Sequence, residues 1–188
     1  MTYAPASKHS YPWTTQLRDK RVTLRLMQPE EATTLLAFAR SLPEEDLLFL
    51  SIDITKPEAV ESWAHNIRAG RIVTVMAEFE GKMIGHGTLS HNDLLWTRHM
   101  GELQLLISRD YRGIGLGQLL AKEVYSLARQ RGLQKIVARM ASDQKSAIRV
   151  FERMGFRAEA LLADYVIDRK GHTHDLIVMS TDLTGLTL

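Results

Sequence analysis

Apolar and polar residues alternate along several short stretches of the chain, and this period of two is typical of β-strands that bury one face. In the first stretch, residues 21–27, the side chains of Val22, Leu24 and Leu26 share a face. Gly81 lies at the centre of a turn between two further stretches. The pattern predicts strands over residues 21–27, 72–77, 83–89, 101–108, 135–140, 156–167 and 174–179.

A second pattern, with apolar residues three and four positions apart, predicts four helices between these strands. Pro29 and Pro57 each suit the first turn of one helix, Gly70 ends the second and Gly155 ends the last. The buried stripes of the four helices are Ala32, Leu35, Leu36 and Ala39; Val60, Trp63, Ala64 and Ile67; Leu116, Leu119, Leu120, Val124 and Leu127; and Ala147, Ile148, Val150, Phe151 and Met154.

The order of these elements predicts one α/β domain over residues 21–188. At 188 residues and 45% hydrophobic composition, the chain is long enough for one buried core and short for two domains. Residues 1–20 are polar with scattered aromatic side chains and have no sustained period. We expect them to form an extended arm.

A glycine-rich turn joins the strand at 101–108 to the third helix. Gly113, Gly115 and Gly117 stand at every second position and precede or open the helix. Glycine accepts a positive φ and lets a ligand approach the backbone, while the first N–H groups of the helix and its dipole attract an anion. The turn is therefore predicted to bind a phosphate or pyrophosphate.

Two common phosphate loops do not fit this turn. The chain has no Gly-x-x-x-x-Gly-Lys-Ser/Thr motif, and its glycines lack the Gly-x-Gly-x-x-Gly spacing of dinucleotide folds. A nucleoside triphosphate or a nicotinamide cofactor is therefore disfavoured.

Composition narrows the chemistry further. Lys and Arg number 24 against 22 Asp and Glu, so the balance gives no support for nucleic-acid binding. The chain has no cysteine, which excludes a thiol nucleophile and a cysteine-based zinc site.

No apolar run reaches membrane-spanning length and no signal peptide is recognised, so we expect a cytoplasmic protein without a membrane partner. His172, His174 and Asp175 lie after a turn but lack a third ligand at metal-site spacing, so no metal is predicted.

The turn also resembles the Arg/Gln-x-x-Gly-x-Gly/Ala signature of the GNAT superfamily of N-acyltransferases, which Arg112, Gly115 and Gly117 match. A second segment, residues 144–156, is similar to the family's Asn-x-x-Ala-x-x-x-Tyr-x-x-x-Gly-Phe helix. The likeness covers residues 21–182. It implies the GNAT fold, a mixed sheet of about six to seven strands that parts into a cofactor wedge, flanked by about four helices.

The resemblance implies acetyl-CoA as cosubstrate and assigns residues to it. Backbone groups of Leu106 and Ile107 would contact the pantetheine arm, and the N–H of Ile107 would stabilise an oxyanion. The backbone N–H groups of a continuous run would hold the pyrophosphate: Arg112, Gly113, Ile114, Gly115, Leu116 and Gly117. Gln144 stands where the family has its asparagine, and Phe151 where many relatives carry a tyrosine that protonates the leaving thiolate.

An amine must lose a proton before it attacks a thioester, and Glu102 occupies the position where many GNAT enzymes keep a glutamate for this purpose. An outward-facing strand residue, or the partner of an arginine, is the other reading of Glu102. His86 and His99 are alternative bases. Phe151 has no proton to give, so Tyr125, Tyr165, Ser146 or water would protonate the thiolate, or it would leave unprotonated because thiol pKa values lie near about 8.5.

These assignments predict direct acetyl transfer to a primary amine of a small molecule. The groove for the acceptor would be built from the first two helices, residues 96–99 and the last hairpin. Three alternatives stay open: a protein lysine, a protein N-terminus, or a non-catalytic acyl-CoA sensor. Residues 11–32 are similar to the entry of the GNAT domain in bacterial protein-lysine acyltransferases. A homodimer is also left open.

Overall fold

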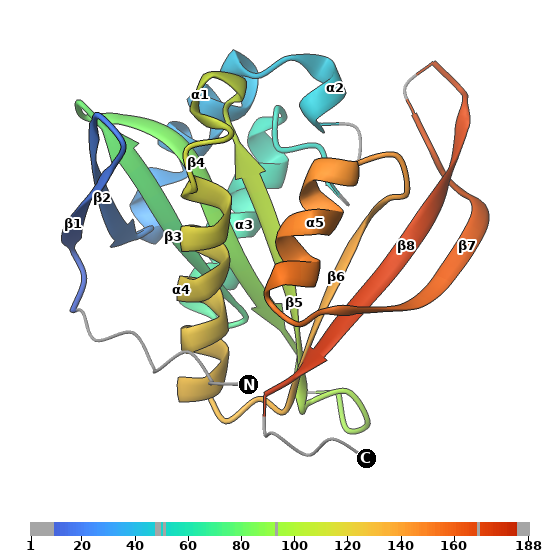
Figure 1. The fold of residues 1–188 in the computed structure, drawn as a ribbon. Helices are drawn as coiled ribbons and strands as arrows, with labels where there is room; N and C mark the ends of the chain where they lie inside the picture. Colours follow the sequence, from blue (N-terminus) through green and yellow to red (C-terminus); the bar gives the residue numbers. More distant parts are fainter. Residues whose placement is uncertain (1–9, 48–49, 51, 93, 169, 184–188) are drawn as a thin grey trace.

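The computed structural model describes residues 10–47, 50, 52–92, 94–168 and 170–183, and its chain forms one eight-stranded mixed sheet with helices on both faces (Figure 1). The spatial strand order is β1-β2-β3-β4-β5-β6-β8-β7. The strands are β1 (Trp13–Leu17), β2 (Lys20–Leu26), β3 (Ile72–Phe79), β4 (Lys82–His91), β5 (Met100–Ile107), β6 (Lys135–Ala141), β7 (Arg157–Ile167) and β8 (Thr173–Asp182).

The helices are α1 (Ala32–Ser41), α2 (Glu44–Leu47), α3 (Pro57–Arg68), α4 (Leu116–Gln130) and α5 (Lys145–Arg153). Two 3₁₀ turns, η1 (Pro29–Glu31) and η2 (Arg109–Tyr111), precede α1 and α4. None of the described helices is long and apolar enough to span a membrane.

The predicted α/β fold class and mixed sheet are confirmed, with one strand more than expected. Residues 13–17, placed by the sequence in the extended arm, form β1 and pair antiparallel with β2. Residues 1–9 of that arm lie outside the described part. The short helix α2 was also missed, because four residues are too few to establish a helical period.

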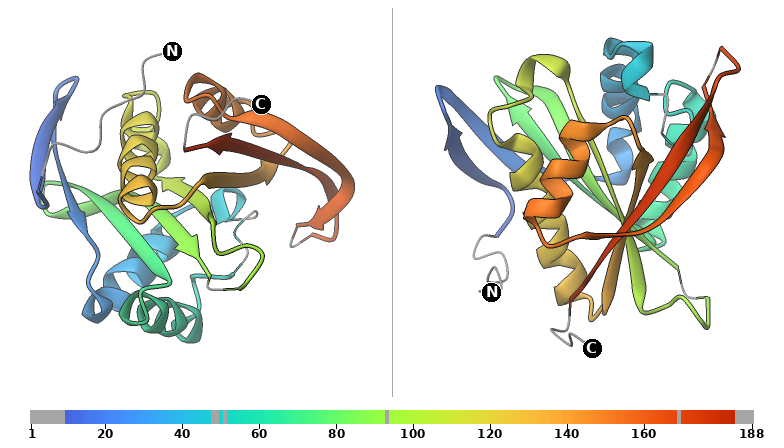
Figure 2. Two further views of the ribbon diagram at one scale, coloured as in Figure 1. Left: turned by 90° about the horizontal axis from the view of Figure 1, so that it is seen from below. Right: turned by 45° about the vertical axis from the view of Figure 1, so that its right-hand side comes forward.

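The two faces of the sheet carry different helices (Figure 2). Helices α4 and α5 pack on one face through a cluster that includes Val124, Phe151 and Phe156. Helices α1 and α3 pack on the other face through a cluster that includes Leu35, Trp63 and Leu106. The buried stripes predicted from the sequence therefore face the sheet from both sides.

The sheet divides where β5 meets β6, its only parallel pair within the described chain. Residues 100–102 of β5 pair with residues 135–137 of β6, and the pairing stops there. Beyond this point β5 stays paired with β4 as far as Ile107, and β6 stays paired with β8 as far as Ala141. Figure 1 shows the two strands together at their starts and spread apart at their ends. We call this gap the fork.

Candidate active site

The glycine turn lies at the end of β5, at the open side of the fork. Gly113 has φ 74° and Gly115 has φ 95°, so both occupy the left-handed region that glycine tolerates best. Gly115 is the N-cap of α4, and no side chain caps the helix there. A Cβ atom at either glycine would meet no heavy atom within 4 Å, so the space outside the turn is open.

The backbone amides at this turn are available for an anion. Within the described part of the chain, the N–H groups of residues 113–117 donate to no backbone carbonyl. They belong to the uncapped N-terminus of a fifteen-residue helix, whose dipole favours negative charge. The turn therefore fits a pyrophosphate on its own chemistry.

Arg112 takes a structural role instead. Its backbone N–H donates to the carbonyl of Arg109 at 3.2 Å, and its guanidinium donates to the carbonyl of Ile107 at 3.0 and 3.1 Å. The same guanidinium pairs at 2.8 Å with Asp46 of α2, whose side chain is 7% exposed. The described contacts thus leave Gly113 to Gly117, rather than Arg112, to face an anion.

Two contacts at the turn were missed by the sequence analysis. Asp46 holds Arg112, and Arg18 of the β1–β2 turn donates to the carbonyl of Gly113 at 2.9 Å. Asp46 lies in an acidic run and Arg18 in the expected arm, so nothing in the sequence pattern connects either residue to a turn more than 60 positions away.

The direction of the β5 backbone supports the role predicted for Ile107. The N–H of Ser108 donates to the carbonyl of Ile84 at 3.0 Å, toward β4. Because successive amides of a strand point to opposite sides, the N–H of Ile107 points away from β4, toward the fork. The Leu106 side chain is 4% exposed and packs into the cluster under α1 and α3.

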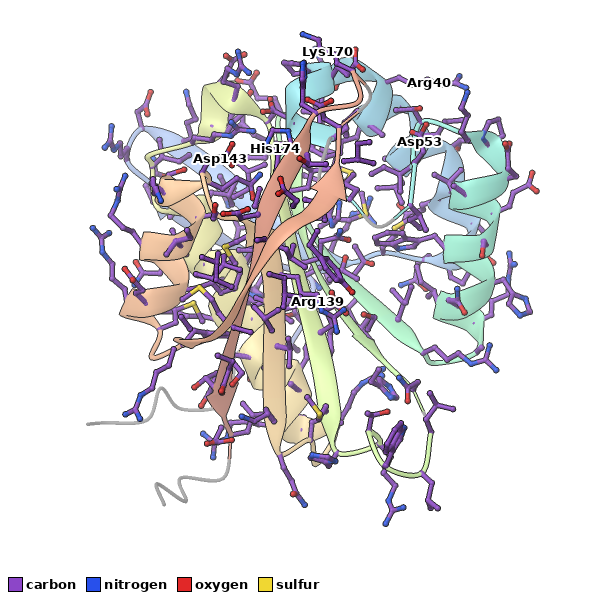
Figure 3. All side chains as sticks on the ribbon, turned by 90° about the vertical axis from the view of Figure 1, so that its right-hand side faces the viewer. Arg40, Asp53, Arg139, Asp143, Lys170 and His174 are labelled. Atoms are coloured by element: carbon purple, nitrogen blue, oxygen red, sulfur yellow. The ribbon has the colours of Figure 1, made fainter. Side chains whose placement is uncertain are left out.

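Glu102 stands at the base of the fork, at the last position of β5 that pairs with β6. Its carboxylate lies 2.8 Å from the guanidinium of Arg139 on β6, and the two side chains are 40% and 53% exposed. Figure 3 shows Arg139 over the middle of the sheet, on the face that carries α3. Both readings of Glu102 therefore keep support: it partners an arginine, and it stands beside the fork.

Glu102 and Arg139 share a groove of about 370 Å³ on this face of the sheet. Helix α3 contributes Asn66, and the loop between β4 and β5 contributes Asn92 and Thr97. The groove thus includes the second predicted helix and part of the predicted loop. Among the described residues, none of α1 or of the β7–β8 hairpin lines it, and β6 supplies a wall that the sequence analysis did not expect.

Residues 35–156 match the model of the acetyltransferase (GNAT) family, which is 122 of the 188 residues. The chain belongs to the GNAT acetyltransferase family. The matched segment runs from α1 through the fork and the glycine turn to the end of α5. The expected family and its fold are therefore confirmed.

Three relatives illustrate the range of this GNAT family. A Xenopus tropicalis protein named "Probable N-acetyltransferase camello" is 32% identical over 87 residues, which are 44% of this chain and 37% of that protein's length. A phosphinothricin acetyltransferase from Sinorhizobium meliloti, solved with acetyl-CoA, superposes with TM-score 0.73 at 22% identity, over 88% of this chain and 92% of that one. A ribosomal-protein-alanine N-acetyltransferase from Brucella melitensis gives TM-score 0.74 at 21% identity, over 85% and 98%.

In this GNAT acetyltransferase, the alternative bases lie in other surroundings. His86 is fully buried under α1 and α3, with its ring edge-on to Phe38 and Trp63 at 6.2 and 5.7 Å. Burial lowers the pKa of His86 to about 4. Its Nδ1 lies 3.1 Å from the hydroxyl of Thr88, and its Nε2 has no hydrogen-bond partner. His99 is not among the residues that line the groove.

The residues predicted from the second motif stand on α5. Gln144 is the N-cap of this helix and is half-buried. Phe151 is 4% exposed, and its ring packs edge-on against Phe156 at 5.0 Å. Of the alternative acids, Tyr165 is 64% exposed on β7 and Tyr125 packs against the core under α4. The roles of Gln144 and Phe151 toward a cofactor stay predictions.

The histidines near the last hairpin form a polar cluster without metal-site geometry. His172 and His174 each approach Asp168, at 3.4 and 3.3 Å. The backbone amide of His172 and the hydrogen bond from His174 lower the pKa of Asp168 to about 2. Among the described residues, no group of three or more His, Asp or Glu side chains is arranged to hold a metal ion. Figure 3 shows His174 above Arg139, on the side of the molecule where Lys170 lies.

Proposed function

We propose that this GNAT protein transfers an acetyl group from acetyl-CoA directly to a primary amine of a small molecule. The observation that carries the proposal is the fork: an uncapped glycine turn at its open side, an inward-facing amide at Ile107, and Glu102 at its base. These three features lie on consecutive parts of one strand and the helix that follows it.

The pyrophosphate of the cosubstrate would be held by the amides of Gly113 to Gly117, and its pantetheine arm by the backbone of β5 beside Leu106 and Ile107. Acetyl-CoA supplies the acetyl group as a thioester, whose carbonyl carbon accepts an amine. The N–H of Ile107 faces the fork and is suited to stabilise negative charge on a carbonyl oxygen. One such donor contributes about 3–4 kcal/mol in other acyl transfers.

Glu102 is the proposed proton acceptor. An alkyl amine with a pKa of about 10.4 is almost entirely protonated at neutral pH, so a carboxylate that takes the proton makes the nitrogen nucleophilic. The C–N bond then forms as the C–S bond breaks and the thiolate of CoA departs. The second proton of the nitrogen passes to this thiolate, directly or through water, to give free CoA, and Glu102 releases the first proton to solvent. Direct transfer agrees with the composition, because the chain has no cysteine to carry an acyl intermediate.

The small volume of the groove favours a small acceptor. Its volume of about 370 Å³ is at the lower end of the range for small-molecule sites, about 300–1,000 Å³. The structural relatives include enzymes named for a small acceptor and for a protein acceptor, so likeness alone does not choose between them.

Release of free CoA measures this function. Purified protein is incubated with acetyl-CoA and a panel of small amines, and with peptides that carry a lysine or a free N-terminus. We expect turnover with small amines, and an approximately hundredfold or greater loss of kcat in Glu102→Gln, in the usual range for a general base. Acetyl-CoA binding, measured by calorimetry, should persist in that variant.

Glu159→Gln is the matched control, because Glu159 is a glutamate of β7 that pairs with Lys135 and does not line the groove. Turnover with peptides but not with small amines would move the proposal to a protein acceptor. Tight acetyl-CoA binding without turnover on any amine would favour a sensor.

A further inference from the structure

The charges in the groove are arranged in a way that the proposed reaction does not require. Among the described residues that line it, those with a permanent charge are Arg71, Arg139 and Glu102. The groove therefore carries two guanidinium groups for each carboxylate. A site built only to receive a protonated amine needs the carboxylate and gains nothing from two nearby cations, which repel the amine.

The one carboxylate is already paired. Glu102 lies 2.8 Å from Arg139, so an ammonium group that approaches Glu102 competes with an internal ion pair. If the ammonium displaces Arg139, the guanidinium loses its partner as the acceptor and cosubstrate cover the groove. An unpaired charge costs more the better it is shielded from water. An acceptor with an anionic group removes this cost, because it provides Arg139 with a new partner.

We propose that the acceptor is an amino carboxylate, a small molecule whose amine binds Glu102 while its carboxylate binds Arg139. The ligand's ammonium then takes the place of Arg139 beside Glu102, and its carboxylate takes the place of Glu102 beside Arg139. Because the two receptor groups are in direct contact, the amine and the carboxylate must be only a few bonds apart, as in a free α-amino acid. This inference rests on the proposed function and specifies its substrate class.

Arg71 is a second cation on the wall of the groove, on the β4 side of Glu102, whereas Arg139 stands on the β6 side. Arg71 lies in the short connection between α3 and β3 and lines the same groove. In the described structure its side chain makes no ion pair, in contrast to Arg139, so its charge is available for a ligand. Two arginines near one carboxylate favour recognition of an oxyanion over recognition of a neutral or cationic group.

The same reasoning disfavours a protein N-terminus. In a peptide the first carboxyl group is an amide, so the acceptor presents an ammonium and no nearby negative charge. Binding would break the Glu102–Arg139 pair without replacing it. A free amino acid and its carboxamide are nearly the same size and differ in the charge of this one group, which also raises the pKa of the amine in the free acid. The difference in amine pKa is the same for every variant of the protein, so the change in the ratio between the two probes on mutation reports the contact with the carboxylate.

The test compares kcat/KM for free α-amino acids with varied side chains, each assayed beside its own carboxamide at saturating acetyl-CoA. We expect the preferred amino acid to exceed its carboxamide by about tenfold or more, the range of one charge-assisted hydrogen bond. Arg139→Gln should lower this ratio about tenfold or more, mainly through a higher KM for the free acid. Arg139→Lys, which keeps the charge without the planar fork, should give an intermediate ratio.

Arg157→Gln is the control, because Arg157 lies on β7 and does not line the groove. Its ratio of acid to carboxamide should equal that of the unmodified protein. Equal rates for acid and carboxamide, or a ratio that Arg139→Gln leaves unchanged, would overturn the inference while the acetyltransferase function stands. If no amine in either set is acetylated, the proposed function fails, and this inference with it.

Discussion

At the scale of the residue, the surroundings of a titratable side chain decide what chemistry it can do. Glu102 stands in a groove with an arginine partner, whereas His86 is enclosed by Phe38 and Trp63. Behind His86, Thr88 lies 3.2 Å from Thr74, which accepts a hydrogen bond from the Trp63 indole at 3.0 Å. This buried polar chain ends at His86, whose Nε2 is without a partner, so protonation of the ring is disfavoured.

His86 is therefore expected to make the fold sensitive to acid. Its pKa is about 4 in the folded protein and about 6.5 when unfolded, so the unfolded chain binds a proton first as the pH falls. The stability from neutral His86 is complete above about pH 6.5 and is lost between about 6.5 and 4. At pH 5 the free energy of unfolding should be about 2 kcal/mol lower than at pH 7.5. Urea unfolding at the two pH values measures this difference.

His86→Leu cannot take up this proton, so its free energy of unfolding should fall less than that of the unmodified protein between the same two pH values. His65→Leu on α3 serves as a control, because that histidine lies in the last turn of a surface helix. An equal loss of stability in the unmodified protein and in His86→Leu would show that other groups cause the acid sensitivity.

At the scale of the element, the sequence predicted α4 and its glycine turn well because their determinants are local. A left-handed N-cap needs glycine, and a helix start needs the spacing of Leu116, Leu120 and Val124. The fork depends on distant partners instead. After residue 137, β6 no longer pairs with β5 but stays paired with β8, which lies about 40 residues further along the chain.

Gly115→Ala should weaken acetyl-CoA binding as well as the fold. A left-handed alanine costs about 1–2 kcal/mol, and relief of that strain would turn the first amides of α4 away from the anion. Gly132→Ala is a close control: Gly132 has φ 72°, lies just after the other end of α4, and its added Cβ would likewise meet nothing within 4 Å.

Both variants should lose similar stability in thermal or urea unfolding, but calorimetry should detect weaker acetyl-CoA binding in Gly115→Ala alone. Equal affinities in the two variants would mean that the pyrophosphate is bound elsewhere on the molecule.

At the scale of the whole molecule, the sheet consists of two parts that meet at a short parallel pairing. The first part runs from β1 to β5, the second comprises β6, β8 and β7, and three residues of each central strand join them. Helices α4 and α5 cover the junction on one face (Figure 2). A ligand in the fork would contact both parts and replace the pairing that the strands lack.

Hydrogen exchange should locate this ligand. With acetyl-CoA, we expect slower exchange of the amides of residues 113–117 and of Ile107, and little change in β7. Pantetheine lacks the pyrophosphate, so at saturation it should protect Ile107 without protecting residues 113–117. Protection by pantetheine at the glycine turn, or none at β5, would contradict the orientation proposed for the cosubstrate.

The sequence by itself determined the fold class, most strands and helices, the family and the glycine turn before α4, because periodicity, glycine positions and helix starts are properties of neighbouring residues. The tertiary structure decided which side chains meet: Glu102 with Arg139, and Arg112 with Asp46. It also decided that residues 13–17 pair with β2 as the edge strand β1, and that His86 is buried. These outcomes depend on contacts between residues far apart in the chain, which no local pattern contains.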